Sequence, residues 1–244
     1  MSPRKTFATA KRVLKQLKHD HRTLVLILFV PLLLITLLKY IYNGQPMLFN
    51  SIAPMILGIF PLLMMFLVTS IATLRERTSG TLDRLMTQPV GKLDLIFGYA
   101  IAFSFVGLLQ ACLASFVTLG LLGVTVQGGT LPLIITAVFA AFLGTALGLF
   151  VSAFARNEFQ AVQLVMPILM PQILLCGLFI ARAEMATVLQ WLSNVFPVTY
   201  SVDAMKQVSQ YASWSSDLTR DLIVIFGFSI VVLILGAATI RRQE

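Results

Sequence analysis

The chain has 244 residues, of which 58% are hydrophobic and only 11% are charged. Soluble domains carry charge on about a quarter of their residues, so this composition excludes an ordinary soluble protein. The net charge is +8, and because the basic residues flank apolar runs, we attribute it to membrane topology and lipid headgroups rather than to nucleic acid. Since the apolar runs are continuous rather than alternating, they predict membrane-spanning helices and not barrel strands.

Residues 1–22 are basic and amphipathic. Lysines and arginines occupy one helical face, and the apolar side chains on the other face are Phe7, Ala10, Val13, Leu14 and Leu17. This pattern predicts a helix that lies in the membrane interface and does not span the bilayer. His19 and His21 are two residues apart and cannot share a helix face, so we expect no metal site.

Six apolar runs are long enough to cross a bilayer, which takes about 20 residues in a helix. They cover residues 23–42, 51–74, 95–123, 131–155, 159–181 and 220–240, and their central portions contain no Asp, Glu, Lys, Arg or His. We therefore predict an all-α integral membrane protein, organised as a single domain over residues 1–244.

The distribution of basic residues predicts the orientation of the spans. Fourteen Lys and Arg residues precede span 1, lie between spans 2 and 3, or follow spans 4 and 6. Only four fall on the opposite side, namely Lys39, Arg182, Lys206 and Arg220. Because cytoplasmic loops are enriched in Lys and Arg, we expect both termini and residues 75–92 to be cytoplasmic.

Two spans contain small residues at a spacing of four. They are Ala140, Gly144, Gly148 and Ser152 in span 4, and Gly107, Ala111 and Ser115 in span 3. Such stripes allow helices to approach closely, and we interpret both as packing within the chain rather than between subunits. Cys112 and Cys176 each lie inside an apolar run without a partner at metal-site spacing, so we interpret them as buried structural thiols.

Prolines interrupt three spans. Pro31 lies in span 1, Pro54 and Pro61 in span 2, and Pro167 and Pro171 in span 5. Each removes an intrahelical donor and can kink its helix. Two interpretations remain open: the prolines serve packing geometry, or spans 2 and 5 bend beside a cavity.

Residues 182–217 form the longest internal segment outside the spans. They contain two short helical patterns separated by Pro197, and we expect an outer re-entrant helical pair there. The aromatic residues suit the membrane interface, and they are Trp191, Tyr200, Tyr211 and Trp214. They either anchor the segment or form part of a lid over an outer exit.

The sequence lacks the signatures of several functions. It has no Walker phosphate loop, and the spans contain no metal, nucleophile or acid–base set for catalysis. We therefore expect no enzyme active site. A proton- or ion-coupled carrier usually has ionisable ligands near the midplane, and these spans have none. The energy source is therefore expected on another chain.

The densest internal charge cluster lies in residues 75–92. Residues 78–80 are expected to break the helix that leaves span 2, and Thr81 can cap a new one whose first turn holds Asp83. Pro89 ends this short helix, and its apolar face comprises Leu82, Leu85 and Met86. The pattern is typical of a short helix that docks into a groove on a soluble partner. The alternative is a surface helix that lies on lipid.

The sequence ERTSGTLDRLMTQPVGKLDLIFGYAIAF, residues 76–103, resembles the coupling-helix region of the ABC-2 type exporter permeases. The family pattern there is E-R-x-x-G-T-L-[DE]-x-L-x-x-[ST]-P. The matching residues are Glu76, Arg77, Gly80, Thr81, Leu82, Asp83, Leu85 and Pro89. Gln88 stands where a small hydroxyl residue is frequent, which is a minor departure.

A second stretch, WLSNVFPVTYSVDAMKQV at residues 191–208, is similar to the family segment N-P-[LV]-T-Y-x-[VI]-[DE]-A-[LM]-[RK]. The matching residues include Asn194, Pro197, Thr199, Tyr200 and Asp203, while Phe196 interrupts the usual Asn-Pro pair. The two motifs occur in the family's order, and with the basic first helix and the six spans the resemblance covers nearly the whole chain.

The resemblance implies a half-transporter in a bacterial plasma membrane. It would pair with a second permease chain, identical or sibling, and with ATP-binding subunits that hold ATP and magnesium, so that this chain carries no cofactor. Glu76 and Arg77 would fix the angle of the coupling helix, and Leu82 and Leu85 would bury in the ATPase groove. The expected activity is export of a hydrophobic or amphipathic drug, lipid or glycoconjugate.

In this interpretation, spans 2 and 5 line a cavity between two permease chains. Methionine and phenylalanine accept varied apolar shapes, and glutamines add polar groups. The candidate lining residues are Phe60, Met64, Met65, Met166, Met170, Gln163 and Gln172. Two other functions remain open: a membrane anchor or immunity scaffold for a soluble partner, and an ion-coupled carrier.

Overall fold

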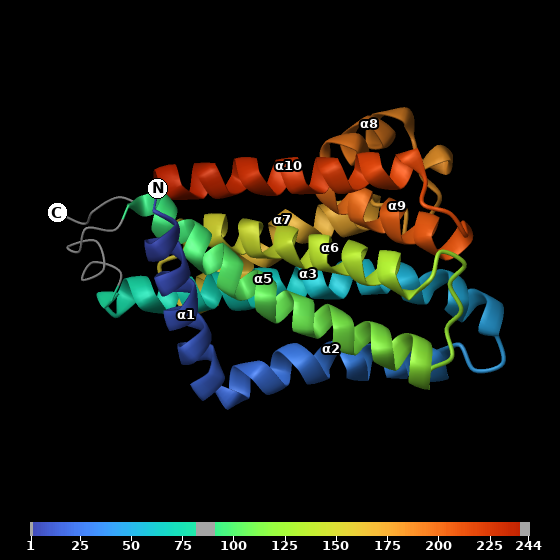
Figure 1. The fold of residues 1–244 in the computed structure, drawn as a ribbon. Helices are drawn as coiled ribbons and strands as arrows, with labels where there is room; N and C mark the ends of the chain where they lie inside the picture. The colour runs from blue at the N-terminus through green and yellow to red at the C-terminus, as the bar shows by residue number, and fades with distance from the viewer. Residues whose placement is uncertain (1, 82–90, 240–244) are drawn as a thin grey trace.

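The computed structural model describes residues 2–81 and 91–239. This part of the chain contains helices and no strands (Figure 1). The α-helices are α1 (Pro3–His19), α2 (His21–Ile41), α3 (Pro46–Thr78), α5 (Lys92–Phe116), α6 (Thr130–Ser152), α7 (Glu158–Leu175), α8 (Thr187–Val195), α9 (Pro197–Gln210) and α10 (Ser216–Thr239). A π-helical turn, Val117–Leu121, extends α5, and a 3-10 turn, Arg182–Glu184, precedes α8.

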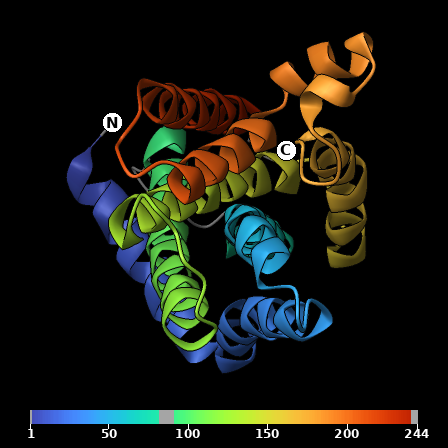
Figure 2. The same cartoon turned by 90° about the vertical axis from the view of Figure 1, so that its right-hand side faces the viewer.

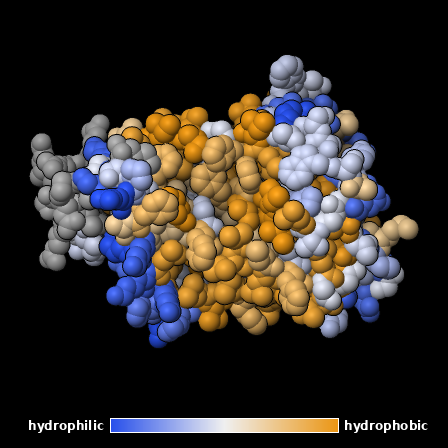
Figure 3. Space-filling view, in the orientation of Figure 1, coloured by the Kyte–Doolittle hydropathy of each residue, from blue (hydrophilic) through white to orange (hydrophobic). Residues whose placement is uncertain are grey.

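Six of the described helices are long and apolar enough to cross a membrane: α2, α3, α5 with its extension, α6, α7 and α10. Each overlaps one of the six predicted spans, with different ends, and the six run along a roughly common direction (Figure 1). Helix α1 crosses one end of the bundle, called the α1 end below, and α8 and α9 lie at the opposite α9 end. A broad hydrophobic band separates these two more hydrophilic ends on the face shown in Figure 3.

Helix α6 occupies the centre of the bundle, where it contacts α3, α5, α9 and α10 (Figure 2). The small-residue stripe makes this packing possible. A Cβ atom on Gly144 would lie 2.0 Å from the carbonyl oxygen of Leu62, and one on Gly148 would lie 2.6 Å from that of Phe66. Because the backbones of α3 and α6 approach this closely, the prediction that the stripe packs within the chain is confirmed.

Helices α2 and α7 lie at the edge of the bundle. Only 17% of the α2 span and 22% of the α7 span is buried, against 67% for α6. Helix α7 is also shorter than the predicted span 159–181, because Gly177 takes a left-handed conformation with φ of 82° just beyond its last residue. The peripheral position leaves apolar faces of both helices exposed.

One cysteine prediction is confirmed and the other is wrong. Cys176 is buried, as expected, but Cys112 is exposed. Cys112 belongs to an outward face of α5 that also exposes Phe105, Leu109 and Phe116. Apolar periodicity within a membrane span does not distinguish this outward face from the core face, since lipid and protein interior are both apolar.

Candidate functional site

A partly buried ionic junction joins three helices at the α1 end. Arg12 of α1 binds Glu76 in the last turns of α3 through both guanidinium nitrogens, at 2.9 and 3.1 Å. Tyr99 of α5 donates its hydroxyl to the same carboxylate and accepts a hydrogen bond from Arg12 at 3.0 Å. The Glu76 side chain is only 13% exposed, so water weakens these contacts little. The bidentate pair links α1 to α3, and the Tyr99 hydroxyl links both to α5.

Arg77 anchors the same end of α3 to a different neighbour. Its guanidinium donates to the backbone carbonyls of Ala153, at 2.8 Å, and Ala155, at the connection between α6 and α7. Helix α3 extends to Thr78 rather than ending at residue 74, so Arg75, Glu76 and Arg77 are part of it. The acidic and basic members of the first motif therefore hold the tip of α3 from two sides.

The predicted helix break after span 2 is confirmed. Helix α3 ends at Thr78, and Gly80 adopts a left-handed conformation with φ of 70°, which glycine accepts without strain. The hydroxyl of Thr81 lies 3.0 Å from that of Ser79, and its capping role stays a prediction. The remaining motif residues fall outside the described ranges, so their roles also stay predictions: Leu82, Asp83, Leu85 and Pro89.

The start of α5 is also tied to α1. The carboxylate of Asp94 accepts the backbone N–H of Ser2 at 2.7 Å and that of Gly91 at 3.2 Å. A Cβ atom on Gly98 would lie 2.6 Å from Cβ of Thr9, so α1 and α5 are in close contact. Residues 82–90 are thus flanked on both sides by elements bound to α1, through Glu76 before the segment and Asp94 after it.

Helix α1 packs against the bundle more than its sequence pattern predicts. Ala10, Val13 and Leu17 of the expected apolar face are buried, while Phe7 is exposed. Thr6 and Thr9, which are polar, are buried as well. The buried face is therefore rotated away from Phe7, because α5 is the surface that α1 covers.

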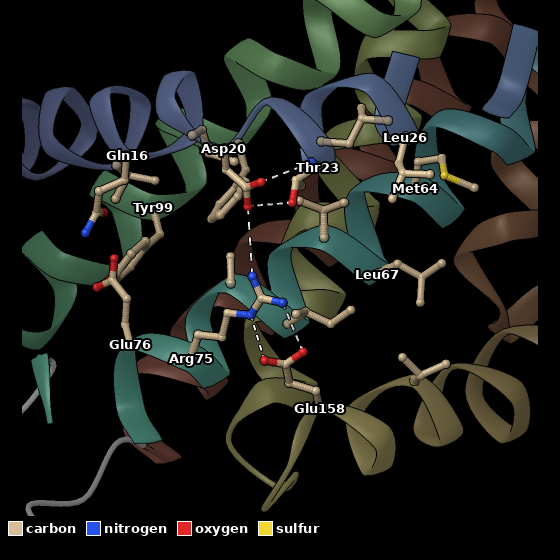
Figure 4. A pocket seen from close by; sticks show the side chains of 18 of the residues that line it. Gln16, Asp20, Thr23, Leu26, Met64, Leu67, Arg75, Glu76, Tyr99 and Glu158 are labelled. Atoms are coloured by element: carbon tan, nitrogen blue, oxygen red, sulfur yellow. Dashed lines mark hydrogen bonds and ion pairs between the residues drawn. The ribbon is translucent and has the colours of Figure 1, made fainter. Parts of the chain in front are cut away.

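A pocket of about 570 Å³ opens between α1, α2, α3 and α7 (Figure 4). Met64 lines it, but this pocket lies within one chain, so the role of Met64 in a cavity between two permeases stays a prediction. Met65 is fully buried and Gln172 nearly so, and the prediction that they line an open cavity is wrong for this chain. Met65 faces Gly107 of α5, and Gln172 donates to the carbonyl of Ile168 in its own helix at 2.8 Å. Both residues therefore lie on the inward-facing sides of their helices.

The other predicted cavity residues do not line this pocket. Phe60 is partly buried and packs against the core, and the remaining three are exposed on α7: Gln163, Met166 and Met170. An open face of α7 is compatible with a cavity that a second chain completes, and that role stays a prediction.

Three charged residues at the polar end of the pocket were not singled out from the sequence. Arg75 binds Glu158 at 2.7 and 3.1 Å and lies 3.9 Å from Asp20 (Figure 4). Hydrogen bonds from the side chain and backbone of Thr23 lower the pKa of the Asp20 carboxyl below its ordinary value, so Asp20 is ionised at neutral pH. The sequence did contain a signal for two of them, because Asp20 directly precedes the first span and Glu158 directly precedes the fifth.

At the α9 end, the second motif forms one hydrogen-bonded unit. Helices α8 and α9 meet at Phe196 and Pro197, which agrees with the predicted helical pair. Arg182 pairs with Asp203 at 2.7 Å and donates to Asn194 at 3.1 Å, and the Tyr200 hydroxyl donates to the Asn194 carbonyl at 2.7 Å. Thr199 is buried against Ser193.

The described part of the first motif, Glu76 to Thr81, and the second motif thus lie at opposite ends of one helical bundle. The family model described as ABC-2 type transporter matches residues 4–209. The chain belongs to the ABC-2 type transporter family. With six helices able to span a bilayer, this ABC-2 chain is a multi-pass membrane protein.

Curated relatives of this ABC-2 chain carry transporter names. It is 23% identical over 207 residues to "Probable multidrug ABC transporter permease YbhS" of Escherichia coli K12, covering 84% of this chain and 54% of that protein. It is 26% identical over 175 residues to "Inner membrane transport permease YhhJ" of the same strain, covering 71% and 46%. The match to "ABC transporter G family member 20" of Dictyostelium discoideum has 26% identity over 141 residues, covering 58% and 19%. The chain thus spans between about a fifth and about half of these relatives.

Removing Arg182 tests the hydrogen-bonded unit at the α9 end of the ABC-2 chain. Burial raises the pKa of the Asp203 carboxyl, and the Arg182 charge partly offsets this effect. A raised carboxyl pKa means that the folded state binds the proton more tightly, so stability increases as the pH falls through the folded pKa. We expect Arg182→Ala to lower the melting temperature clearly at about pH 7.5 and much less at about pH 4.5.

The control is the double variant Arg182→Ala with Asp203→Asn, in which the titrating carboxyl is gone. Its melting temperature relative to the wild type should vary far less with pH. An equal loss for Arg182→Ala at both pH values would contradict the assignment of this ion pair.

Proposed function

We propose that the chain is the permease of an ATP-binding-cassette exporter and that residues 82–90 are its contact with a separate ATP-binding subunit. One observation carries the proposal. The tip of α3 and the start of α5, which flank this segment, are both bound to α1, by Glu76 and Asp94 respectively. A force applied to residues 82–90 would therefore reach three helices together, as a coupling element requires.

The transport mechanism follows from this linkage. ATP binding closes the partner dimer and displaces residues 82–90 of each permease. The Arg12–Glu76–Tyr99 junction makes α1, α3 and α5 respond as one body, while the weakly buried α2 and α7 can change their neighbours. Access to the substrate site then alternates between the two membrane faces at the expense of ATP held by the partner.

The orientation rests on charge. In this proposal the α1 end, which carries the basic residues of α1, lies in the cytoplasm together with both termini. The two motifs then face opposite compartments, with the first toward the ATP-binding subunit and the second toward the outside. The membrane would be a bacterial plasma membrane.

A second permease chain would cover the open face of α7. Val162, Met166, Met170 and Leu174 recur at four-residue spacing on that helix and are all exposed. A substrate cavity between two such faces would be apolar and would suit a hydrophobic or amphipathic molecule. ATP and magnesium would be bound by the partner subunit, with no cofactor on this chain.

Co-purification tests the proposal. The tagged chain is extracted from its native membrane in mild detergent, and the complex is weighed by native mass spectrometry. We expect two permease chains and two ATP-binding subunits, with vanadate-sensitive ATPase activity. A well-folded chain that brings down no ATPase would contradict the proposal and favour a scaffold or an ion-coupled carrier.

A further inference from the structure

We propose that the pocket between α1, α2, α3 and α7 binds an amphipathic cation, with its charged group beside Glu158 and its apolar body between α2 and α3. The inference rests on the proposed function and deepens it, because it names the class of molecule that the permease accepts. The site is lined by one chain, and its edge at Val162 adjoins the α7 face that a second permease would cover.

The walls of the pocket are apolar over most of its length. Leu26 and Val30 of α2 face Met64, Leu67 and Val68 of α3. At about 570 Å³, its volume falls within the range of about 300–1,000 Å³ that is usual for small-molecule sites. The walls belong to spans, so an apolar molecule dissolved in the bilayer could reach them directly.

The polar end of the pocket carries more negative than positive charge. Among the described residues, the carboxylates that line it are Asp20, Glu76 and Glu158, and the guanidinium that lines it is Arg75. Glu76 is neutralised by Arg12 outside the lining, which leaves Asp20 and Glu158 to share Arg75. One negative charge is therefore left over at the mouth of an apolar pocket, where a cation is favoured and an anion is repelled.

Within the described part of the chain, Arg22 is a further cation near this end of the pocket. Arg22 attracts the Asp20 carboxylate, but it is solvent-exposed and does not line the pocket. Its electrostatic effect on Asp20 is also smaller than that of Arg75. Asp20 is also held by Thr23, through its hydroxyl at 2.6 Å and its backbone N–H at 3.1 Å, so Glu158 is the carboxylate that is freer to change partner.

Arg75 then acts as an internal competitor for the ligand. It is 55% exposed and Glu158 is 51% exposed, so the guanidinium can move into solvent when another cation takes its place. Substitutions of Glu158 and of Arg75 should consequently have opposite effects on the affinity for the cation. Removing Glu158 weakens cation binding, while removing Arg75 strengthens it. If the pair served only to hold α3 against α7, both substitutions would weaken binding.

The test uses two probes of nearly the same shape and opposite charge, tetraphenylphosphonium and tetraphenylborate. The purified chain is placed in nanodiscs of zwitterionic lipid, and binding is measured against empty nanodiscs. We expect saturable binding of tetraphenylphosphonium that is at least about tenfold tighter than that of tetraphenylborate. Glu158→Gln should weaken it about tenfold, and Arg75→Gln should strengthen it.

Glu184→Gln is the matched control, because Glu184 lies in the exposed turn at the α9 end and should leave binding unchanged. Equal affinity for the two probes, or weaker binding in both Glu158→Gln and Arg75→Gln, would overturn the proposal. The measurement needs no ATP-binding subunit. A failure here therefore refutes the cation site alone, whereas normal binding in a chain that recruits no ATPase would refute the proposed function.

Discussion

Replacing Glu76 with alanine is expected to destabilise the chain by about 2 kcal/mol, because it leaves the Arg12 guanidinium without its bidentate partner. Fully buried pairs cost about 3–5 kcal/mol when one member is removed, and the expected loss is smaller here since Arg12 is still 28% exposed. The melting temperature in detergent should fall by about 4–8 °C.

A double-mutant cycle separates this junction from a general loss of packing. Arg12→Ala and Glu76→Ala should be strongly non-additive, since either change alone leaves a lone charge and the double variant leaves none. Glu76→Gln keeps one acceptor oxygen, which can still accept from Arg12 Nη2 and the Tyr99 hydroxyl but not from Arg12 Nη1, so it should lose less stability than alanine. Additive losses from the two single variants would contradict the junction.

Replacing Gly144 with alanine is expected to disturb the centre of the bundle more than any other single methyl group. The added Cβ would lie 2.0 Å from the carbonyl oxygen of Leu62, and a backbone atom cannot turn aside. Overpacking usually costs about 1–3 kcal/mol, and this contact belongs at the upper end of that range. We expect a fall in melting temperature of about 6–12 °C.

Gly227→Ala is the matched control for this experiment. Gly227 lies within α10, and a Cβ atom there would meet nothing within 4 Å. Alanine also favours helix over glycine by about 1 kcal/mol, so this variant should melt at or slightly above the wild-type temperature. Similar melting temperatures for Gly144→Ala and Gly227→Ala would refute the close approach of α3 and α6.

The membrane spans could be predicted because a long apolar run in lipid has one main solution, a helix that satisfies its own backbone. Their ends were less certain. Span 5 ends at Leu175 because Gly177 turns the chain, although residues 176–181 remain apolar. Span 2 continues through Arg75, Glu76 and Arg77, since ion pairs and backbone carbonyls offset the cost of placing these charges on the helix.

The candidate site was predicted only in part. The motif residues Glu76 and Arg77 could be identified, but not their partners. Arg12 is 64 residues from Glu76, and Glu158 is 83 residues from Arg75. Such pairs depend on how the helices pack, and a local sequence pattern cannot predict them. For the same reason, the sequence could not show that Met64 faces the pocket while its neighbour Met65 faces the core.

If residues 82–90 dock an ATP-binding subunit, changing their apolar side chains should reduce the amount of that subunit recovered with a tagged chain. Recovery is measured with three tagged chains. These are the wild type, the double variant Leu82→Asp with Leu85→Asp, and the double variant Leu189→Asp with Leu192→Asp. The last pair has the same spacing and lies exposed on α8, at the other end of the bundle. All three are compared after size-exclusion chromatography shows a folded chain.

We expect a near-stoichiometric ATPase with the wild type and the α8 variant, and a loss of more than about tenfold with Leu82→Asp and Leu85→Asp, since central apolar contacts dominate such interfaces. Equal recovery of the ATPase with all three chains would show that residues 82–90 do not dock it.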